Sequence, residues 1–453
     1  MNEVILENFD LHSTAPTQVG AEVSKEEFID VQHSIERDGT IDFIVTCGDD
    51  EYIDPYNIKL YFAYRILQED NTRFGPAHDV AIGKYAPVNG AGYAFFKGLV
   101  VKLNDTVIAD NDVLYSFRGD IESRLSNTIA GKKYTLQLMG FEEEKEAFED
   151  IAEAEIWLPN DGGGAAPIQI VDSTLGDRIR STRRSREKHI ITPLFSEIFD
   201  QQKFLPPHSK LSISLIRNDY QFSLLSKVNA RTYQIAYTKV KLIVRKVKAS
   251  PELSKQIQSE TILRDVKEKY PLRRVEMKYY TKNANSTDLT INNIFEGILP
   301  RRFFFVMIRQ DSFNGTLTLD PFNYQDFAIR EMSFKIGNET LPYPPIEVNF
   351  QNNSANCLAL YALLRATNTW NGENSLGFGI NNYNDRNCIF GYDLAASELP
   401  AGESFEPVKE GSSTLSIRLN VGAPHPIVII VYAEYDAELQ IDKNRHVTFY
   451  KNA

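Results

Sequence analysis

The chain has 453 residues, of which 42% are hydrophobic, and this length exceeds the size at which a single hydrophobic core usually stops growing. We therefore expect two domains of roughly 200 residues each. The net charge of −12 excludes a surface that neutralises phosphate over its whole area, and three scattered cysteines exclude a disulfide framework. The 27 Phe and 22 Tyr, against 2 Trp and 5 Met, favour a chain built mainly of strands.

The first residues of the chain, MNEVILENFDLHSTAPTQVG, lack both a basic segment and a following apolar run, so they do not predict a signal peptide. No stretch approaches the ~18 consecutive apolar residues of a membrane-spanning helix, and we expect no membrane span. Because Cys47, Cys357 and Cys388 lie far apart in the sequence, they indicate a protein of a reducing compartment.

Alternating apolar and polar residues predict strands over 58–66, 210–215 and 238–244. One face of the first strand is entirely apolar and includes Ile58, Leu60, Phe62, Tyr64 and Ile66. Strands of this kind are typical of antiparallel sheets with one covered face. The expected inward face of the third strand consists of Thr238, Val240, Leu242 and Val244.

The spacing of Val113, Phe117, Ile121 and Leu125 predicts a helix over 112–126, although Gly119 weakens this prediction. The segment 249–269 is polar, with Pro251 near its start, and it is interpreted as a connector between two domains that contains a short helix.

Two segments, 95–108 and 327–341, share one pattern: an apolar strand, a turn rich in Asn, Asp or Gly, and a returning strand. Two copies of one sandwich would leave such a pattern. The connections 158–167 and 368–387 are long and rich in Gly, Pro and Asn. A sandwich or jelly roll is therefore favoured over a doubly wound parallel sheet.

The sequence offers no catalytic, cofactor-binding or metal-binding residues. It has no phosphate-binding loop, its seven histidines are dispersed, and the group Asn384, Asp385, Asn387 and Cys388 is interpreted as a turn. Two alternatives stay open. The Tyr- and Asn-rich segment 370–384 suits a carbohydrate-binding β-sandwich, and the 61 acidic residues leave room for the paired carboxylates of a glycoside hydrolase.

Two charged segments stand out. A basic strip, interpreted as a polar loop, consists of Arg178, Arg180, Arg183, Arg184, Arg186 and Lys188. It is predicted either to pair with acidic residues of a neighbouring subunit or to contact DNA phosphate. The acidic segment 142–155 is its candidate complement.

The second half contains, in order, YPLRRVEMK from Tyr270, GILP from Gly297, FNGTLTLDPFNYQDF from Phe313 and YAEYDAELQIDKNR from Tyr432. Together with EYIDPYNIKLYFAYRI from Glu51, these segments resemble the major capsid proteins of Polinton (Maverick) and adintovirus-type elements. The resemblance implies an all-β fold, a double jelly roll of two antiparallel eight-stranded β-sandwiches with a few short helices in loops. The implied domains are an N-terminal arm (1–24), a first jelly roll (25–248), a linker (249–269) and a second jelly roll (270–453).

The same resemblance implies a structural protein rather than an enzyme: a hexon-type major capsid protein without cofactors. Its partners would be copies of itself, in pseudo-hexameric homotrimers that build an icosahedral shell, and a minor capsid (penton) protein at the vertices. Double-stranded DNA would be packaged inside without sequence-specific contact. We expect it in the virion capsid, after synthesis in the host cytoplasm and assembly in the cytoplasm or nucleus. The sequence leaves open whether the gene belongs to a free virus, an integrated element or a domesticated copy.

Overall fold

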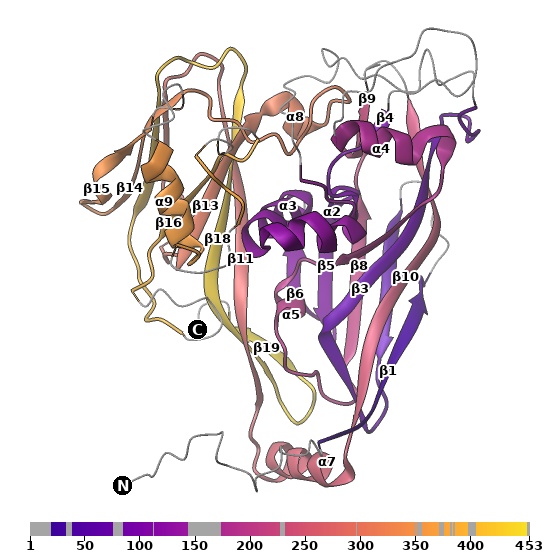
Figure 1. Cartoon of the computed structure of the whole chain (residues 1–453). Helices are drawn as coiled ribbons and strands as arrows, with labels where there is room; N and C mark the ends of the chain where they lie inside the picture. Colours follow the sequence, from indigo (N-terminus) through magenta and orange to yellow (C-terminus); the bar gives the residue numbers. More distant parts are fainter. Residues whose placement is uncertain are drawn as a thin grey trace, which may run out of the picture.

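The computed structural model describes residues 20–32, 39–75, 85–111, 113–143, 174–226, 232–295, 297–348, 350, 356–370, 376–380, 383, 386–396 and 405–450. Within them, two β-sandwiches stand side by side, joined at one end by a helical connector (Figure 1).

The first sandwich consists of two antiparallel four-stranded sheets. In spatial order, its outer sheet contains β1 (Ala21–Asp30), β10 (Tyr233–Ala249), β3 (Glu51–Gln68) and β7 (Lys188–Pro193). Its second sheet contains β2 (Thr40–Thr46), β8 (Lys210–Arg217), β5 (Phe96–Leu103) and β6 (Thr106–Asn111). A separate two-stranded sheet pairs β4 (Tyr85–Pro87) with β9 (Leu224–Ser226).

The second sandwich repeats this construction. One sheet contains β11 (Glu268–Lys282), β18 (Ile427–Ile441), β13 (Arg302–Arg309) and β16 (Ile389–Asp393), with β19 (Val447–Tyr450) added beside β18. The other contains β12 (Asp288–Asn292), β17 (Ser413–Leu419), β14 (Ile329–Ile336) and β15 (Glu339–Glu347).

The strand order is the same in both sandwiches. If the eight main strands of each are numbered along the chain, both have one sheet in the order 1-8-3-6 and the other in the order 2-7-4-5. This is the order of a jelly roll, so the predicted all-β double jelly roll is confirmed. The two similar segments of the sequence analysis are the hairpins β5–β6 and β14–β15, which occupy the same place in each sandwich.

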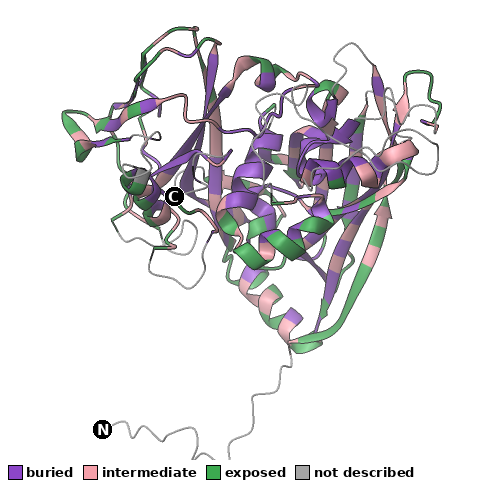
Figure 2. Ribbon diagram, turned by 45° about the horizontal axis from the view of Figure 1, so that its top comes forward, coloured by how far each residue is buried: buried purple, intermediate pink, exposed green. Residues whose placement is uncertain are grey.

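The predicted strands lie within β3, β8 and β10, and the apolar face of β3 is buried from Ile58 to Ile66. The prediction for Thr238 is wrong. The register of β10 against β3 shifts between Tyr237 and Lys239, and this bulge leaves Thr238 exposed. Buried residues fill the interiors of both sandwiches (Figure 2).

Most helices lie in the connections between strands. The longer ones are α3 (Tyr115–Ser126), α4 (Thr174–Thr182), α7 (Pro251–Gln258) and α9 (Asn356–Ala366). Single turns form α2 (Ala91–Ala94), α5 (Glu197–Asp200), α6 (Tyr220–Ser223), α8 (Gln310–Asn314), η2 (Gly131–Thr135), η3 (Leu136–Met139), η4 (Arg183–Ser185) and η5 (Ser259–Leu263).

The connector helix α7 begins after Ser250, whose hydroxyl accepts from the backbone N–H of Leu253, with Pro251 in the first turn. The expected short helix is thus present. The strands of the two sandwiches occupy 21–249 and 268–450. The domain boundaries at 24/25, 248/249 and 269/270 stay a prediction.

The two sandwiches are arranged head to tail. The sheet of β11, β18 and β13 faces the helices of the first sandwich, whereas β1, β10 and β3 face away from the second sandwich, at the opposite side of the molecule (Figure 1). At the other extreme lie β15 and α9 (Figure 1).

Candidate functional site

Helix α3 positions much of the buried charge between the sandwiches. The expected helix is present, but Val113 lies before it and is 47% exposed. Instead of burying one apolar stripe, α3 is buried almost all round, and its buried charged residues are Arg118, Asp120, Glu122 and Arg124. Apolar periodicity does not reveal these four, because charged residues are expected on the surface.

Gly119, which weakened the helix prediction, has a packing role. A Cβ atom at this position would lie 2.5 Å from the Cβ of Tyr93 in α2. The close approach of the two helices also lets the Tyr93 hydroxyl donate to Asp120 at 2.9 Å.

The larger cluster, which we call the ionic junction, consists of Arg118, Glu122, Glu197, Asp200, Arg273, Arg302, Tyr432 and Glu434. On the side of the first sandwich, Arg118 donates to Glu122 at 2.9 Å and to Glu197 at 3.0 Å. Glu197 also accepts from the backbone N–H of Val275 in β11, at 3.2 Å. This contact ties the first sandwich to a strand of the second.

On the side of the second sandwich, Arg273 donates to Glu434 at 3.0 Å and to Asp200 of α5 at 2.7 Å. Arg302 donates to the other oxygen of Glu434 at 2.5 Å. The Tyr432 hydroxyl donates to Glu122 at 2.9 Å. The junction therefore runs continuously from α3 to β18.

Burial acts on the three enclosed carboxyls of the junction, those of Glu122, Glu197 and Glu434, and the arginines decide how far it is opposed. Burial raises the pKa of Glu122, and Arg118 and Arg273 offset this only in part. Burial also acts on Glu434, but there Arg302 and Arg273 prevail and lower its pKa. The pKa of Glu197 is likewise lowered, because Arg118 and backbone N–H donors, among them that of Val275, together outweigh the effect of burial.

Two carboxyls whose pKa values are shifted apart are also a feature of glycoside hydrolases. The space beside Glu122 and Glu434 argues against that chemistry. The cavity lined by these two residues, Arg273, Arg302 and Tyr432 measures ≈ 30 Å³. That volume holds about two water molecules. The carboxyls, moreover, already share the Tyr432 hydroxyl at 2.9 and 3.3 Å, so the hydrolase alternative is not favoured.

Two further cations of the first sandwich bind the second sandwich. Arg124 pairs with Asp120 at 2.8 Å and donates to the Asn387 side chain at 2.7 Å. Lys132, which is 3% exposed, donates to the backbone carbonyl of Leu376 at 2.6 Å. Burial lowers the pKa of Lys132 to about 7.

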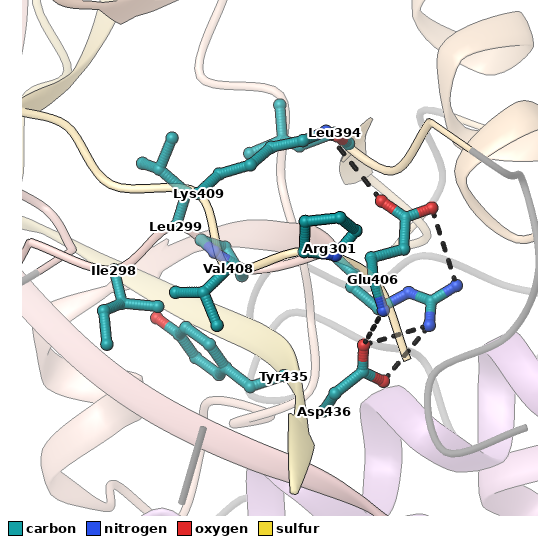
Figure 3. A pocket seen from close by; sticks show the side chains of 11 residues that line it. Ile298, Leu299, Arg301, Leu394, Glu406, Val408, Lys409, Tyr435 and Asp436 are labelled. Atoms are coloured by element: carbon teal, nitrogen blue, oxygen red, sulfur yellow. Dashed lines mark hydrogen bonds and ion pairs between the residues drawn. The ribbon is translucent and has the colours of Figure 1, made fainter. Parts of the chain in front are cut away.

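A second pocket lies in the second sandwich, next to Arg301, Glu406 and Asp436 (Figure 3). Arg301 donates to both oxygens of Asp436 at 3.1 Å, and Lys409 donates to the backbone carbonyl of Leu394 at 2.6 Å. The space measures ≈ 40 Å³, room for a few water molecules. Neither pocket has room for a sugar or a nucleotide.

The basic strip is not the polar loop that the sequence predicted. Arg178 and Arg180 lie in α4, Arg183 and Arg184 in η4, and Lys188 in β7. Arg178 is buried at 4% exposure, whereas Arg186 is exposed. The strip therefore does not present its six cations on one surface. The signal for α4 was the spacing of two buried apolar residues, Leu175 and Ile179, four positions apart.

The other predicted features have mixed outcomes. Residues 144–155 of the acidic segment and residues 371–375, 381–382 and 384 of the Tyr- and Asn-rich segment lie outside the described residues, and Trp370 is exposed. No group of three His, Cys, Asp or Glu suited to a metal ion occurs in the part of the chain that the structure describes. Among the described residues, no helix combines the length and apolar character needed to cross a membrane.

Comparison with known proteins shows which chains share this architecture. No protein-family model matches the chain. An uncharacterized protein of Caenorhabditis elegans is 19% identical over 448 residues, which covers 95% of this chain and 98% of that protein.

Solved structures resemble the chain over nearly its whole length. A chain of the Sputnik virophage has a TM-score of 0.61 at 14% identity and covers 99% of this chain and 92% of its own. The PBCV-1 virus capsid gives a TM-score of 0.57 at 10% identity, with 97% and 100% covered. The Faustovirus major capsid protein gives 0.54 at 8% identity, with 100% and 93% covered. The fold is thus the double jelly roll of viral capsid proteins.

Proposed function

We propose that the chain is a hexon-type major capsid protein, which forms pseudo-hexameric homotrimers that build an icosahedral shell around double-stranded DNA. The observation that carries this proposal is the same eight-strand order, present twice in one chain. Two similar units in each of three chains give six units, so a three-fold assembly can occupy a six-fold lattice position. The likeness to the PBCV-1 capsid and the Faustovirus major capsid protein supports the same function.

The segments from Tyr270 and Tyr432 favour the Polinton and adintovirus type among such proteins. In this proposal the partners are further copies of the chain and a penton protein at the vertices, and the location is the virion capsid. The protein acts by burying surface between subunits, without catalytic residues. Its net charge of −12 suits a shell that is filled with DNA rather than one that condenses around DNA by charge.

For the basic strip we propose contact with acidic residues of a neighbouring subunit. Arg186, which is exposed, would make this contact. The alternative is contact with DNA phosphate, which would make binding of the isolated protein to DNA strongly salt-dependent.

The mass of the purified protein in solution, measured by light scattering, tests the proposal. The expected species has three times the chain mass of 51.5 kDa, with a hexagonal outline in negative-stain images of the same fraction. A monomer at every concentration and salt condition would refute the capsid function.

A further inference from the structure

The head-to-tail packing inside the chain leaves two surfaces open. Each sandwich has a leading edge, formed by its fifth and sixth strands and the connection between them. It also has a receiving face, the outer surface of its first, eighth and third strands. In the first sandwich the leading edge is β6, β7 and the connection containing α3; in the second it is β15, β16 and the connection containing α9.

Inside the chain, the leading edge of the first sandwich packs on the receiving face of the second. Glu122 of α3 contacts Tyr432 of β18, and Asn104, in the turn before β6, donates to the carbonyl of Arg445 before β19. The receiving face is made by the alternate residues Arg302 and Phe304 of β13, together with Tyr432.

The leading edge of the second sandwich carries large apolar side chains in the open. Tyr343 of β15 is 87% exposed, and Leu358 and Trp370 are each 57% exposed. Tyr361 of α9 stacks edge-on against Trp370 with ring centroids 4.9 Å apart, which holds the Trp ring in place. This edge lies at the side of the molecule remote from the first sandwich (Figure 1).

The receiving face of the first sandwich is open too. Phe28 of β1 is 57% exposed and lies directly across from Ile243 of β10, and Tyr61 of β3 lies across from Ile191 of β7. The long strands at the far right of Figure 2 are accordingly drawn mostly exposed or half-buried.

Charged residues flank the apolar centres of these two open surfaces. On the receiving face, Glu26 and Asp30 of β1 lie across from Arg245 and Lys241 of β10, whereas the exposed Lys239 lies across from Ala63. Lys239 can therefore meet Glu339 or Glu347, which are exposed at the two ends of β15 on the leading edge. Opposite charges at the rim of an apolar contact favour one pairing over others.

We infer that the leading edge of the second sandwich, centred on Leu358, Tyr361 and Trp370, docks on the receiving face of the first sandwich of another copy, centred on Phe28 and Tyr61. The contact between chains repeats the contact within the chain, so contacts within chains and contacts between chains alternate around a closed ring of six sandwiches. A heterologous contact of this kind closes into a ring when its rotation allows it. The inference rests on the proposed trimer and names the surfaces that form it.

Cross-linking tests this pairing with a cysteine that the chain already has. Cys357 of α9 is exposed, while Cys388 is buried. Phe28→Cys protein, treated with a short bis-maleimide, is expected to give bands of two and three chains on a denaturing gel. Those bands should vanish in Phe28→Cys/Cys357→Ser. They should also be absent from Val421→Cys, because Val421 is 68% exposed and lies in the connection between β17 and β18, outside the strands and helices that form the two surfaces.

A second measurement does not depend on chemistry at cysteine. Trp370→Ser should raise the concentration at which half the chains are trimeric by about tenfold or more, because aromatic anchors dominate interfaces. Val421→Ser should leave it unchanged, and circular dichroism should show both variants folded. A wild-type trimer with no Cys357-dependent cross-link and with no response to Trp370→Ser would overturn the inference while leaving the capsid function standing. A wild-type monomer would overturn both.

Discussion

Removal of Arg118 tests whether the ionic junction holds the fold together. Its side chain is fully buried and pairs with both Glu122 and Glu197. In Arg118→Met, both carboxyls lose their nearest cation, although Glu122 keeps the Tyr432 hydroxyl and Glu197 keeps the N–H of Val275. Loss of one partner from a buried ion pair costs about 3–5 kcal/mol.

We therefore expect the unfolding free energy of Arg118→Met to fall by about 3–5 kcal/mol, which corresponds to a melting midpoint roughly 6–20 °C lower when one sandwich of about 200 residues unfolds as a unit. Differential scanning calorimetry at pH 7 and fixed protein concentration measures the change. Arg180→Met is the matched control. The pair of Arg180 with Asp177 is largely exposed, so its loss should cost less than about 1 kcal/mol.

A compensating variant shows whether the loss of stability comes from lost packing of the Arg118 side chain or from carboxylates left without their cation. Arg118→Met/Glu122→Gln/Glu197→Gln removes the charge of the two carboxylates that lose Arg118 together with the arginine, and it should recover most of the lost stability. The reasoning is refuted if Arg118→Met melts within about 1 kcal/mol of the wild type, or if the triple variant is no more stable than the single one.

Three further predictions concern the contacts around α3. Gly119→Ala should destabilise by about 1–3 kcal/mol in thermal melts, because the added Cβ meets Tyr93, and a wild-type melting midpoint would contradict this packing. At pH 7, Glu122→Gln should cost less stability than Glu434→Gln, because the pKa of Glu122 is raised and that of Glu434 is lowered. The stability of the wild type relative to Glu434→Gln should shrink as the pH falls below about 4.3. If Glu122→Gln and Glu434→Gln lose the same stability at every pH, the opposite pKa shifts of the two carboxyls are wrong. The pKa of Lys132 is lowered to about 7, so the wild type should gain stability relative to Lys132→Met as the pH rises from 7 towards about 10. If the difference in melting midpoint between the two proteins is the same at pH 7 and at pH 9, the prediction is wrong.

Much of the fold could be predicted because strand alternation is local. The apolar faces of β3 and β8 appear directly in the sequence, and the turns of β5–β6 and β14–β15 mark two equivalent hairpins. The bulge at Thr238 could not be predicted, since it depends on the pairing of β10 with β3.

The ionic junction could not be predicted, because its members are distant in the sequence. Glu122 and Tyr432 are separated by 310 positions, and only the docking of two sandwiches brings them together. Periodicity also misleads for α3. An apolar stripe predicts a helix with one covered face, whereas this helix is covered on nearly all sides and its charged residues pair within the chain.

The short connector between β10 and β11 favours the docking of the two sandwiches, whose contact combines the ionic junction with aromatic rings such as those of Phe117 and Phe322. Only 18 residues separate Ala249 from Glu268, and they include α7 and η5. Such a tether keeps the two sandwiches at a high effective concentration, so their docking does not bear the entropy of bringing two free molecules together. A contact between separate chains bears the whole of this entropic cost. Burial of apolar surface is the kind of contact that can offset it. Dilution would then break only every second contact of a six-unit ring, and the released species would be an intact pair of sandwiches rather than a single one.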